Sequence, residues 1–278
     1  MVSRPGHLVG VVPLNRLVLA SRAQTLAQIM LPALYIEDTS PQETVVEFFE
    51  NHDFLGVPVI DDRRRLVGVI TRSAIEEAIS ERAEADLMKT QGVVGGDEIR
   101  SMPTSLRARR RLSWLSINIV LNTIAASVIA LYEETLSAVI ALAVFLPIVS
   151  DMSGCSGNQA VAVSLRELTL GYVKPFELLR VLFKELSIGV INGIALGILL
   201  GTVAWLWKGN VVLGAVVGSA LALNTMLAVS IGGTVPLILK HLSIDPAVAS
   251  SPILTTLTDM FGFFLVLSFA SLMLTQLT

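Results

Sequence analysis

The sequence predicts a membrane all-α bundle of five transmembrane helices, preceded by a small α/β region. Of its 278 residues, 53% are hydrophobic and only 15% are charged, whereas soluble domains average about 25% charged residues. The mean hydropathy is +0.71. Residues 1–111 contain 14 Lys and Arg and 15 Asp and Glu, but the rest of the chain contains only 6 and 8. These compositions indicate a polar first part and a membrane-embedded second part.

Composition also excludes several classes of function. A net charge of −3 gives no basic face for nucleic acid. The single cysteine, Cys155, cannot form an intramolecular disulfide or a cysteine zinc framework. The sequence shows no base–nucleophile pair and no phosphate-binding loop, so no motif in it indicates an enzyme. The first residues lack the apolar core of a signal peptide, so we expect the polar part in the cytoplasm.

The α/β expectation comes from an internal repeat. Residues 8–12, LVGVV, recur as residues 66–70, LVGVI, and a helix-like stretch follows each copy. Before the second copy, the strand-like residues 56–60 turn through DDRR at 61–64, which is typical of a β-hairpin. With a helix expected at residues 44–50, this copy reads helix–strand–strand–helix.

The repeat resembles the CBS domain, whose signature matches VPVID at residues 57–61 and RLVGVIT at 65–71. We expect a partial first unit at residues 1–27 and a second at 28–89. In such domains a Thr, with an Asp three residues later, commonly holds a nucleotide ribose. Here Thr71 is followed by Ala74, so a dimerising scaffold is expected rather than a nucleotide site at Thr71.

Five apolar stretches are long enough to cross the bilayer, which takes about 20 helical residues. A linker or plug helix is expected at residues 90–111, before the membrane domain at 112–278. Lys and Arg gather before the first stretch, between the second and third, and after the fourth, so the positive-inside rule puts the N-terminus in the cytoplasm and the C-terminus outside. The stretches are residues 112–132, 136–165, 186–207, 211–239 and 253–274.

Two features suggest an ion pathway. The second stretch is expected to break at Pro147, because residues 151–159 are polar and glycine-rich, and such backbone in a membrane must line protein or water. An ordinary cytoplasmic loop is the alternative. Asp259 is the only acidic residue of the sequence within an uninterrupted apolar stretch. Such a residue by default marks an ion or proton pathway. A salt bridge to Lys184 or Lys240, or a helix-dipole role, is the alternative for Asp259.

The residues around Asp259 offer oxygen ligands. Ser251 and Pro252 are expected to begin the last helix, and the carbonyl of Thr255 then lies one turn before the carboxylate. Oxygen donors suit a hard cation such as Mg²⁺, which keeps most of its water. Two chains would supply two aspartates around a twofold axis. The membrane potential then suffices to drive a divalent cation inward.

Other small and polar residues of the apolar stretches have a packing interpretation. Gly189, Gly193, Gly197 and Gly201 recur every four residues, which predicts close contact with another helix. Buried amides are costly in lipid, so Asn118, Asn122, Asn192 and Asn224 are expected to face the bundle or a wet lumen.

The membrane part resembles the MgtE family of magnesium channels. Residues 153–159, SGCSGNQ, resemble the family's G-G-N-x-G-N-Q, with Cys155 replacing the first Asn. Residues 245–259 resemble its D-P-A…P…T-x-[ST]-D, and the Lys184-Glu185 pair resembles its K-E. The resemblance implies a homodimer in membrane lipid, with Asp259 and the Thr255 carbonyl binding hydrated Mg²⁺. It also implies a connecting helix that closes the cytoplasmic mouth.

Further site residues are expected from these patterns together. We expect the pore to be lined by Gly157, Asn158, Asn224 and Thr258. An acidic stretch could bind regulatory Mg²⁺, although a solvated helix face is the plainer interpretation; its members are Glu76, Glu77, Glu81, Glu84 and Asp86. The predicted function is Mg²⁺ conduction across the plasma membrane of a bacterial-type cell. A proton- or sodium-coupled divalent metal (Mg or Co) carrier and a non-transporting sensor are the alternatives.

Overall fold

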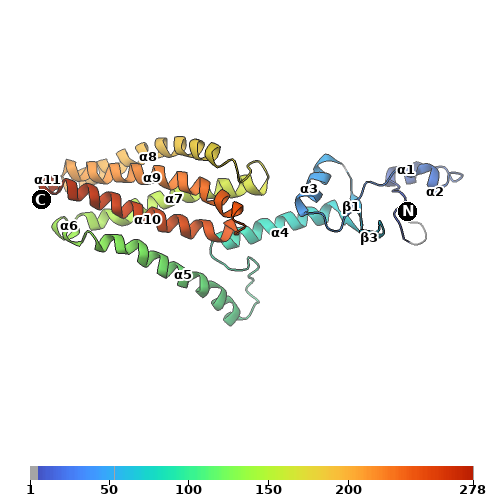
Figure 1. Cartoon of the computed structure of the whole chain (residues 1–278), viewed down its shortest axis with the longest axis horizontal. Coiled ribbons are helices and arrows are strands. Elements are labelled where there is room, and N and C mark those ends of the chain that lie inside the picture. The colour runs from blue at the N-terminus through green and yellow to red at the C-terminus, as the bar shows by residue number, and fades with distance from the viewer. Residues whose placement is uncertain (1–5, 53, 278) are drawn as a thin grey trace. The chain divides into compact units, whose positions relative to one another are not determined.

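The structure is a computed structural model that describes residues 6–52 and 54–277. It contains two compact units, residues 1–84 and 85–278. The first is a small α/β unit and the second is a bundle of helices (Figure 1). The predicted fold class, an all-α bundle preceded by a small CBS-type region, is confirmed.

The first unit is built on a three-stranded sheet in the order β1-β2-β3. β1 (Ile36–Glu37) pairs in parallel with β2 (Gly56–Ile60), which pairs antiparallel with β3 (Leu66–Thr71). The predicted hairpin is therefore confirmed. Short helices precede the hairpin, and a long one follows it: α1 (Leu14–Leu19), α2 (Leu26–Ile29), α3 (Gln42–Asn51) and α4 (Arg72–Thr90).

A small apolar core holds this unit together. Ile36, Val45, Phe49 and Val57 bring β1, α3 and β2 into one cluster. The first copy of the repeat does not form the second copy's strand. Residues 8–12 make only isolated bridges, such as Val11 with Leu31, because no strand among residues 6–52 and 54–277 pairs with them as β2 pairs with β3.

The second unit contains five long helices and two short ones within the described residues. Their bounds are α5 (Thr104–Ala130), α6 (Glu133–Ala138), α7 (Leu142–Thr169), α8 (Leu178–Lys208), α9 (Val211–His241), α10 (Pro246–Leu272) and α11 (Leu274–Leu277). The segment 90–111, expected as a linker or plug helix, starts with the last residue of α4. It continues through turns and ends with the first two turns of α5.

The long helices alternate in direction. At one end of the bundle, Leu142 of α7 packs with Leu213 of α9 and Leu267 of α10. At the other, Ser164 of α7 donates a hydrogen bond to the Gly233 carbonyl of α9. α7 and α9 are therefore parallel, with α8 and α10 running the opposite way (Figure 1). We call the end where α5, α8 and α10 begin the basic end, because nearly all Lys and Arg of this unit lie there.

Four of these helices, α5, α8, α9 and α10, are long and apolar enough to cross a membrane. The fifth, α7, has 28 residues and runs the same course, but residues 151–159 make it more polar. The expected break in this stretch is wrong, since α7 is one continuous helix through Pro147 and residues 151–159.

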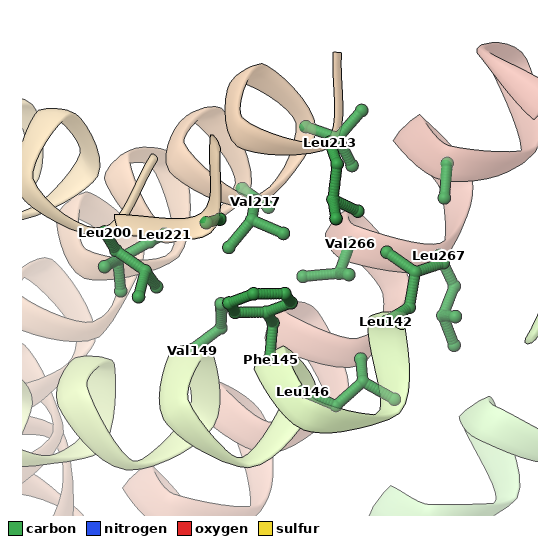
Figure 2. Close-up of a cluster of buried hydrophobic side chains, with 14 of the residues drawn as sticks. Leu142, Phe145, Leu146, Val149, Leu200, Leu213, Val217, Leu221, Val266 and Leu267 are labelled. Atoms are coloured by element: carbon green, nitrogen blue, oxygen red, sulfur yellow. The ribbon is translucent and has the colours of Figure 1, made fainter. Parts of the chain in front are cut away.

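The core of the bundle lies toward the end opposite the basic end. Side chains from α7, α8, α9 and α10 converge there, and Phe145 and Leu142 are fully buried. Figure 2 shows the Phe145 ring between the α7 ribbon and Val217 and Val266 of the facing helices. Such a cluster fixes how α7 and α10 meet, because a close-packed core admits few alternative arrangements.

The glycine face of α8 packs against α9, as predicted. A Cβ atom at Gly197 would lie 2.6 Å from the Gly218 carbonyl oxygen, and one at Gly201 would lie 2.8 Å from that of Gly214. No side chain fits in these gaps. These glycines therefore serve helix packing, and the polar residues of interest lie on α7 and α10.

Candidate functional site

The helix that carries Asp259 begins earlier than expected. Asp245 is the N-cap of α10, and its carboxylate accepts the Ala247 N–H at 3.0 Å. Pro246 is the first helical residue, so Pro252 lies inside the helix. The prediction that Ser251 and Pro252 begin the helix is wrong. Asp followed by Pro supplies both the cap and the fixed φ of a helix start.

α7 is continuous because its small and polar residues separate onto different faces. Gly154 and Gly157 are buried, and a Cβ at Gly157 would lie 2.9 Å from the Ala228 carbonyl oxygen of α9. Asp151, Cys155 and Asn158 are exposed. A spacing of three and four residues is the period of one helix face. The glycines thus allow α9 to approach while the polar side chains face outward.

Two hydrogen bonds join α7 to α10. The hydroxyl of Ser150 donates to the carboxylate of Asp259, and the hydroxyl of Ser251 donates to Oδ1 of Asn158 at 3.1 Å. Ser150 and Asn158 are eight residues apart on α7, as Asp259 and Ser251 are on α10. The two antiparallel helices are thus in register over two turns.

These helices present one continuous polar surface, which we call the polar face. It consists of exposed or half-buried residues, three from each helix: Asp151, Cys155 and Asn158 on α7, with Ser251, Thr255 and Asp259 on α10. It lies near the middle of α7 and in the first half of α10. α5 does not cover it in a single chain, because Ala125 is the one buried residue of that helix, and α5 diverges from α10 toward the basic end (Figure 1).

Asp259 has a polar partner but no positively charged one. Among residues 6–52 and 54–277, no lysine, arginine or histidine forms an ion pair with it, so the structure gives no support for the salt bridge to Lys184 or Lys240. In the same residues no group of three or more His, Cys, Asp or Glu side chains could hold a metal ion.

Thr255 lies one helical turn before Asp259 on α10, as predicted, and both residues belong to the polar face. Its carbonyl oxygen accepts the hydroxyl of Thr258 at 3.0 Å, and its own hydroxyl donates to the Ser251 carbonyl at 2.9 Å. Its oxygens therefore already have protein partners. A role for the Thr255 carbonyl as a metal ligand stays a prediction.

The four residues expected to line a pore occupy different environments. Asn158 is exposed on the polar face. Gly157, Asn224 and Thr258 are buried. Gly157 faces α9, and the Asn224 amide donates to the Thr258 carbonyl at 3.0 Å. These three residues lie behind the polar face in a single chain, and their lining role stays a prediction.

The regulatory and nucleotide candidates lie in the α4 region. Glu76, Glu77, Glu81 and Glu84 are exposed along this helix, while Asp86 lies 3.6 Å from Lys89. Thr71 ends β3, and its hydroxyl accepts the Ala74 N–H at 3.2 Å. That bond satisfies one free N–H of the first turn of α4. Neither Mg²⁺ binding nor nucleotide binding is established for these residues.

An ion pair connects the end of α4 to the start of α10. Lys89 Nζ lies 2.9 Å from Asp245 Oδ2. The hydrogen bond with Asp245 raises the pKa of Lys89 above its ordinary value. Burial acts to raise the pKa of Asp245, but the bonds from Lys89 and the Ala247 N–H outweigh it and leave that pKa lowered. Both groups are thus charged at neutral pH.

A buried carboxylate anchors the start of α5. Glu98 accepts hydrogen bonds from Arg107, at 3.0 Å, and from Arg111, and its side chain is only 3% exposed. The hydrogen bonds from Arg111 and then from Arg107 lower the pKa of Glu98. The arginines predicted to mark the cytoplasmic end of the first span therefore also hold the preceding segment against α5.

Sequence reasoning missed several of these partners. Ser150 lies between the expected break at Pro147 and the polar segment 151–159, so its contact with Asp259 could not be predicted. Ser251 was assigned to capping, and the Lys89–Asp245 pair joins residues 156 positions apart. The spacing of Asp151, Cys155 and Asn158 was a readable signal for a continuous helix.

Comparison with known proteins identifies both parts of the chain. A sequence model of the MgtE family, described as a divalent cation transporter, matches residues 146–269, and a CBS domain model matches residues 26–81. A solved structure of the cytosolic domain of the Mg²⁺ channel MgtE, in complex with ATP, is 33% identical. The match covers 28% of this chain and 32% of that one, with a TM-score of 0.27.

Curated relatives match nearly the whole chain. The magnesium transporter MgtE of Bacillus subtilis (strain 168) is 33% identical over 93% of this chain and 57% of its own length. That of Thermus thermophilus is 32% identical over 99% and 61%. That of Enterococcus faecalis is 31% identical over 98% and 60%. The chain thus spans about three fifths of the length of these relatives. It contains a domain of the MgtE family, preceded by a CBS domain.

Proposed function

We propose that the chain forms a channel-like homodimer that conducts Mg²⁺ through the plasma membrane under the membrane potential. The observation that carries this proposal is the uncovered polar face of α7 and α10, with Asp259 at one end of it. Relatives at 31–33% identity that are named magnesium transporters support Mg²⁺ as the substrate.

The polar face needs a cover that lipid cannot supply. Hydrocarbon offers no hydrogen bonds, so polar side chains at membrane depth face protein or water. A second copy related by a twofold axis would bring two polar faces together and enclose them. Two Asp259 carboxylates would then face the same axis.

The donor set fits a hydrated hard cation. The side chains of the polar face offer carboxylate, amide and hydroxyl oxygens, and Mg²⁺ is commonly held by one or two carboxylates while it keeps several waters. A divalent ion gains about 4.6 kcal/mol per 100 mV of inside-negative potential. No coupled ion or ATP hydrolysis is then required, so we propose a transporter and no enzymatic activity.

The charge distribution supports one orientation. Basic residues of the bundle are concentrated at the basic end, while the opposite end carries only Glu133, Glu134 and Lys208 in the described part of the chain. The positive-inside rule then places the basic end in the cytoplasm. With five crossings, the CBS domain lies inside and the C-terminus outside.

The CBS domain and α4 are proposed to regulate conduction from the cytoplasm. The Lys89–Asp245 pair supports this role, since it ties the end of α4 to the N-cap of the helix that carries Asp259. Regulatory Mg²⁺ at the exposed acids of α4 belongs to the same proposal. We propose a dimerising scaffold for the CBS domain, since the Thr71 hydroxyl already accepts a backbone hydrogen bond.

The proposal is tested by Mg²⁺ flux into liposomes that contain the purified protein, at a potential set with potassium and valinomycin. Asp259→Asn keeps the side-chain volume but removes the charge, so we expect flux to fall to the protein-free background. Glu134→Gln, at the opposite end of the bundle, is the matched control and should retain wild-type flux.

The same assay separates the alternatives. A proton- or sodium-coupled carrier would follow the proton or sodium gradient at constant voltage and would saturate. A non-transporting sensor would give no flux with the wild-type protein. Wild-type flux in Asp259→Asn would refute the assignment of the conducting carboxylate.

A further inference from the structure

Asn224 is a buried amide whose one hydrogen bond reaches the backbone next to Asp259. It lies in the middle of α9 and is fully buried. Its Nδ2 donates to the carbonyl oxygen of Thr258, the residue before Asp259, at 3.0 Å. α10 accommodates this amide closely, since a Cβ at Gly262 would lie 2.7 Å from Nδ2.

This bond is additional to the helix's own hydrogen bonding. In an α-helix the Thr258 carbonyl also accepts the N–H four residues later, at Gly262. The hydroxyl of Thr258 donates to the Thr255 carbonyl on the same turn. The turn from Thr255 to Asp259 is thus contacted from behind by Asn224 and from α7 by Ser150.

The amide has a cost that packing alone does not explain. Its Oδ1 is buried without a hydrogen-bond partner among the described residues, and an unsatisfied buried acceptor costs about 1–3 kcal/mol. A leucine would fill the position without this cost. The cost alone does not assign a role, because the hydroxyl of the adjacent Thr225 is also buried without a partner among the described residues. What distinguishes Asn224 is its hydrogen bond to the Thr258 carbonyl, next to Asp259.

We propose that Asn224 is a positioning residue: its amide fixes the rotation of α10 about its axis, so that the side chains of Asp259 and Thr255 lie on the polar face. The role rests on the proposed conduction through Asp259. Asn224 itself would not touch the ion. This differs from the expectation that its side chain lines the pore.

The test compares Asn224→Leu with Thr225→Val in the liposome flux assay. Thr225 is the adjacent residue of α9, and its buried hydroxyl is also without a partner in the described structure. Valine keeps its shape, so Thr225→Val should leave the flux and the Mg²⁺ to Mn²⁺ flux ratio unchanged. For Asn224→Leu we expect about a tenfold lower Mg²⁺ flux at subsaturating concentration and a changed ratio, with an unchanged or higher melting temperature.

A second readout reports the rotation directly. In a Cys155→Ser background, the thiol introduced by Asp259→Cys should react rapidly with a water-soluble thiol reagent. Adding Asn224→Leu should slow this reaction severalfold if α10 rotates. Asn224→Ala is made in parallel, in case the leucine variant fails to assemble.

The outcomes distinguish this role from the proposed function. Wild-type protein without flux, or Asp259→Asn with full flux, defeats the conduction proposal. An inactive Asp259→Asn beside an Asn224→Leu with wild-type flux, cation ratio and thiol reactivity defeats only the positioning role. That role is also withdrawn if both Asn224 variants fail to fold, because Asn224 would then be needed for folding.

Discussion

At the scale of single residues, Asp259 and Ser150 form the centre of the site. In the described structure the carboxylate accepts a hydrogen bond from a hydroxyl group, and no ammonium or guanidinium group forms an ion pair with it. A hydroxyl can stabilise and orient a carboxylate without neutralising its charge. Under the proposed function, this carboxylate would be the group that meets the cation.

The contact between these residues can be tested on α7. Ser150→Ala removes the donor to Asp259 but leaves the carboxylate, so we expect flux to fall severalfold without being abolished. Ser153→Ala is the matched control, because that hydroxyl donates to the Val149 carbonyl within the same helix. Liposome flux at a set potential measures both. Equal flux in Ser150→Ala and wild type would show that the hydroxyl does not orient the carboxylate.

Asp259 could be selected from the sequence as a candidate site residue, because a carboxylate in an apolar stretch has few structural explanations. Its partners could not, because they depend on the register between α7 and α10. Asn224 shows the same limit. Its position in an apolar stretch predicted a buried or lumen-facing amide, but only the fold shows that it faces the Thr258 carbonyl.

At the scale of elements, α7 shows how a polar, glycine-rich segment can remain helical. Glycine and proline lower helix propensity, which led to the predicted break. Tertiary packing outweighs that preference, because Gly154 and Gly157 are where α7 meets its neighbours. The α8 glycines were easier to interpret, since a four-residue repeat in an apolar stretch has a known packing role.

The Lys89–Asp245 pair gives a pH prediction. Asp245 has a lowered pKa, so its part of the stabilisation is present above the ordinary aspartate pKa of about 3.9 and is lost as pH falls through the lowered value. Lys89 has a raised pKa, so its part is present below about 10.4 and is lost as pH rises through the raised value. Both side chains are partly exposed, so the pair contributes at most about 1 kcal/mol.

We therefore expect Lys89→Met to lower the melting temperature in detergent slightly at pH 7, and to have no effect at a pH below the lowered pKa of Asp245. Lys240→Met, at the same end of the bundle, is the control, because the described structure records no ion pair for Lys240. An equal loss for Lys89→Met at both pH values would show that the ion pair is not the cause.

At the scale of the whole molecule, composition predicted the fold class correctly. A polar first part and an apolar second part required a small soluble region and a helical bundle, because helices satisfy their backbone groups in lipid. The CBS hairpin followed from its turn and strand pattern. The first copy of its repeat did not form a strand, since sequence similarity alone does not supply a pairing partner.

The proposed function requires a second copy of the chain. The polar face is uncovered in one copy, and the α5 surface is exposed along most of its length. Both observations agree with a membrane protein that buries its polar face against a second copy and its apolar helices in lipid. The proposed dimer is therefore the whole-molecule consequence of where α7 and α10 place their polar residues.

The central claim, that the polar face lines the conducting path, is tested most directly through the chain's single cysteine. Cys155 is exposed on that face, so a positively charged methanethiosulfonate reagent would place a fixed positive charge on the polar face, level with Thr255 and about one turn from Asp259. We predict that modification stops Mg²⁺ flux in liposomes, that external Mg²⁺ slows the modification, and that Cys155→Ser is unaffected. Complete labelling of Cys155 with undiminished flux would contradict the account.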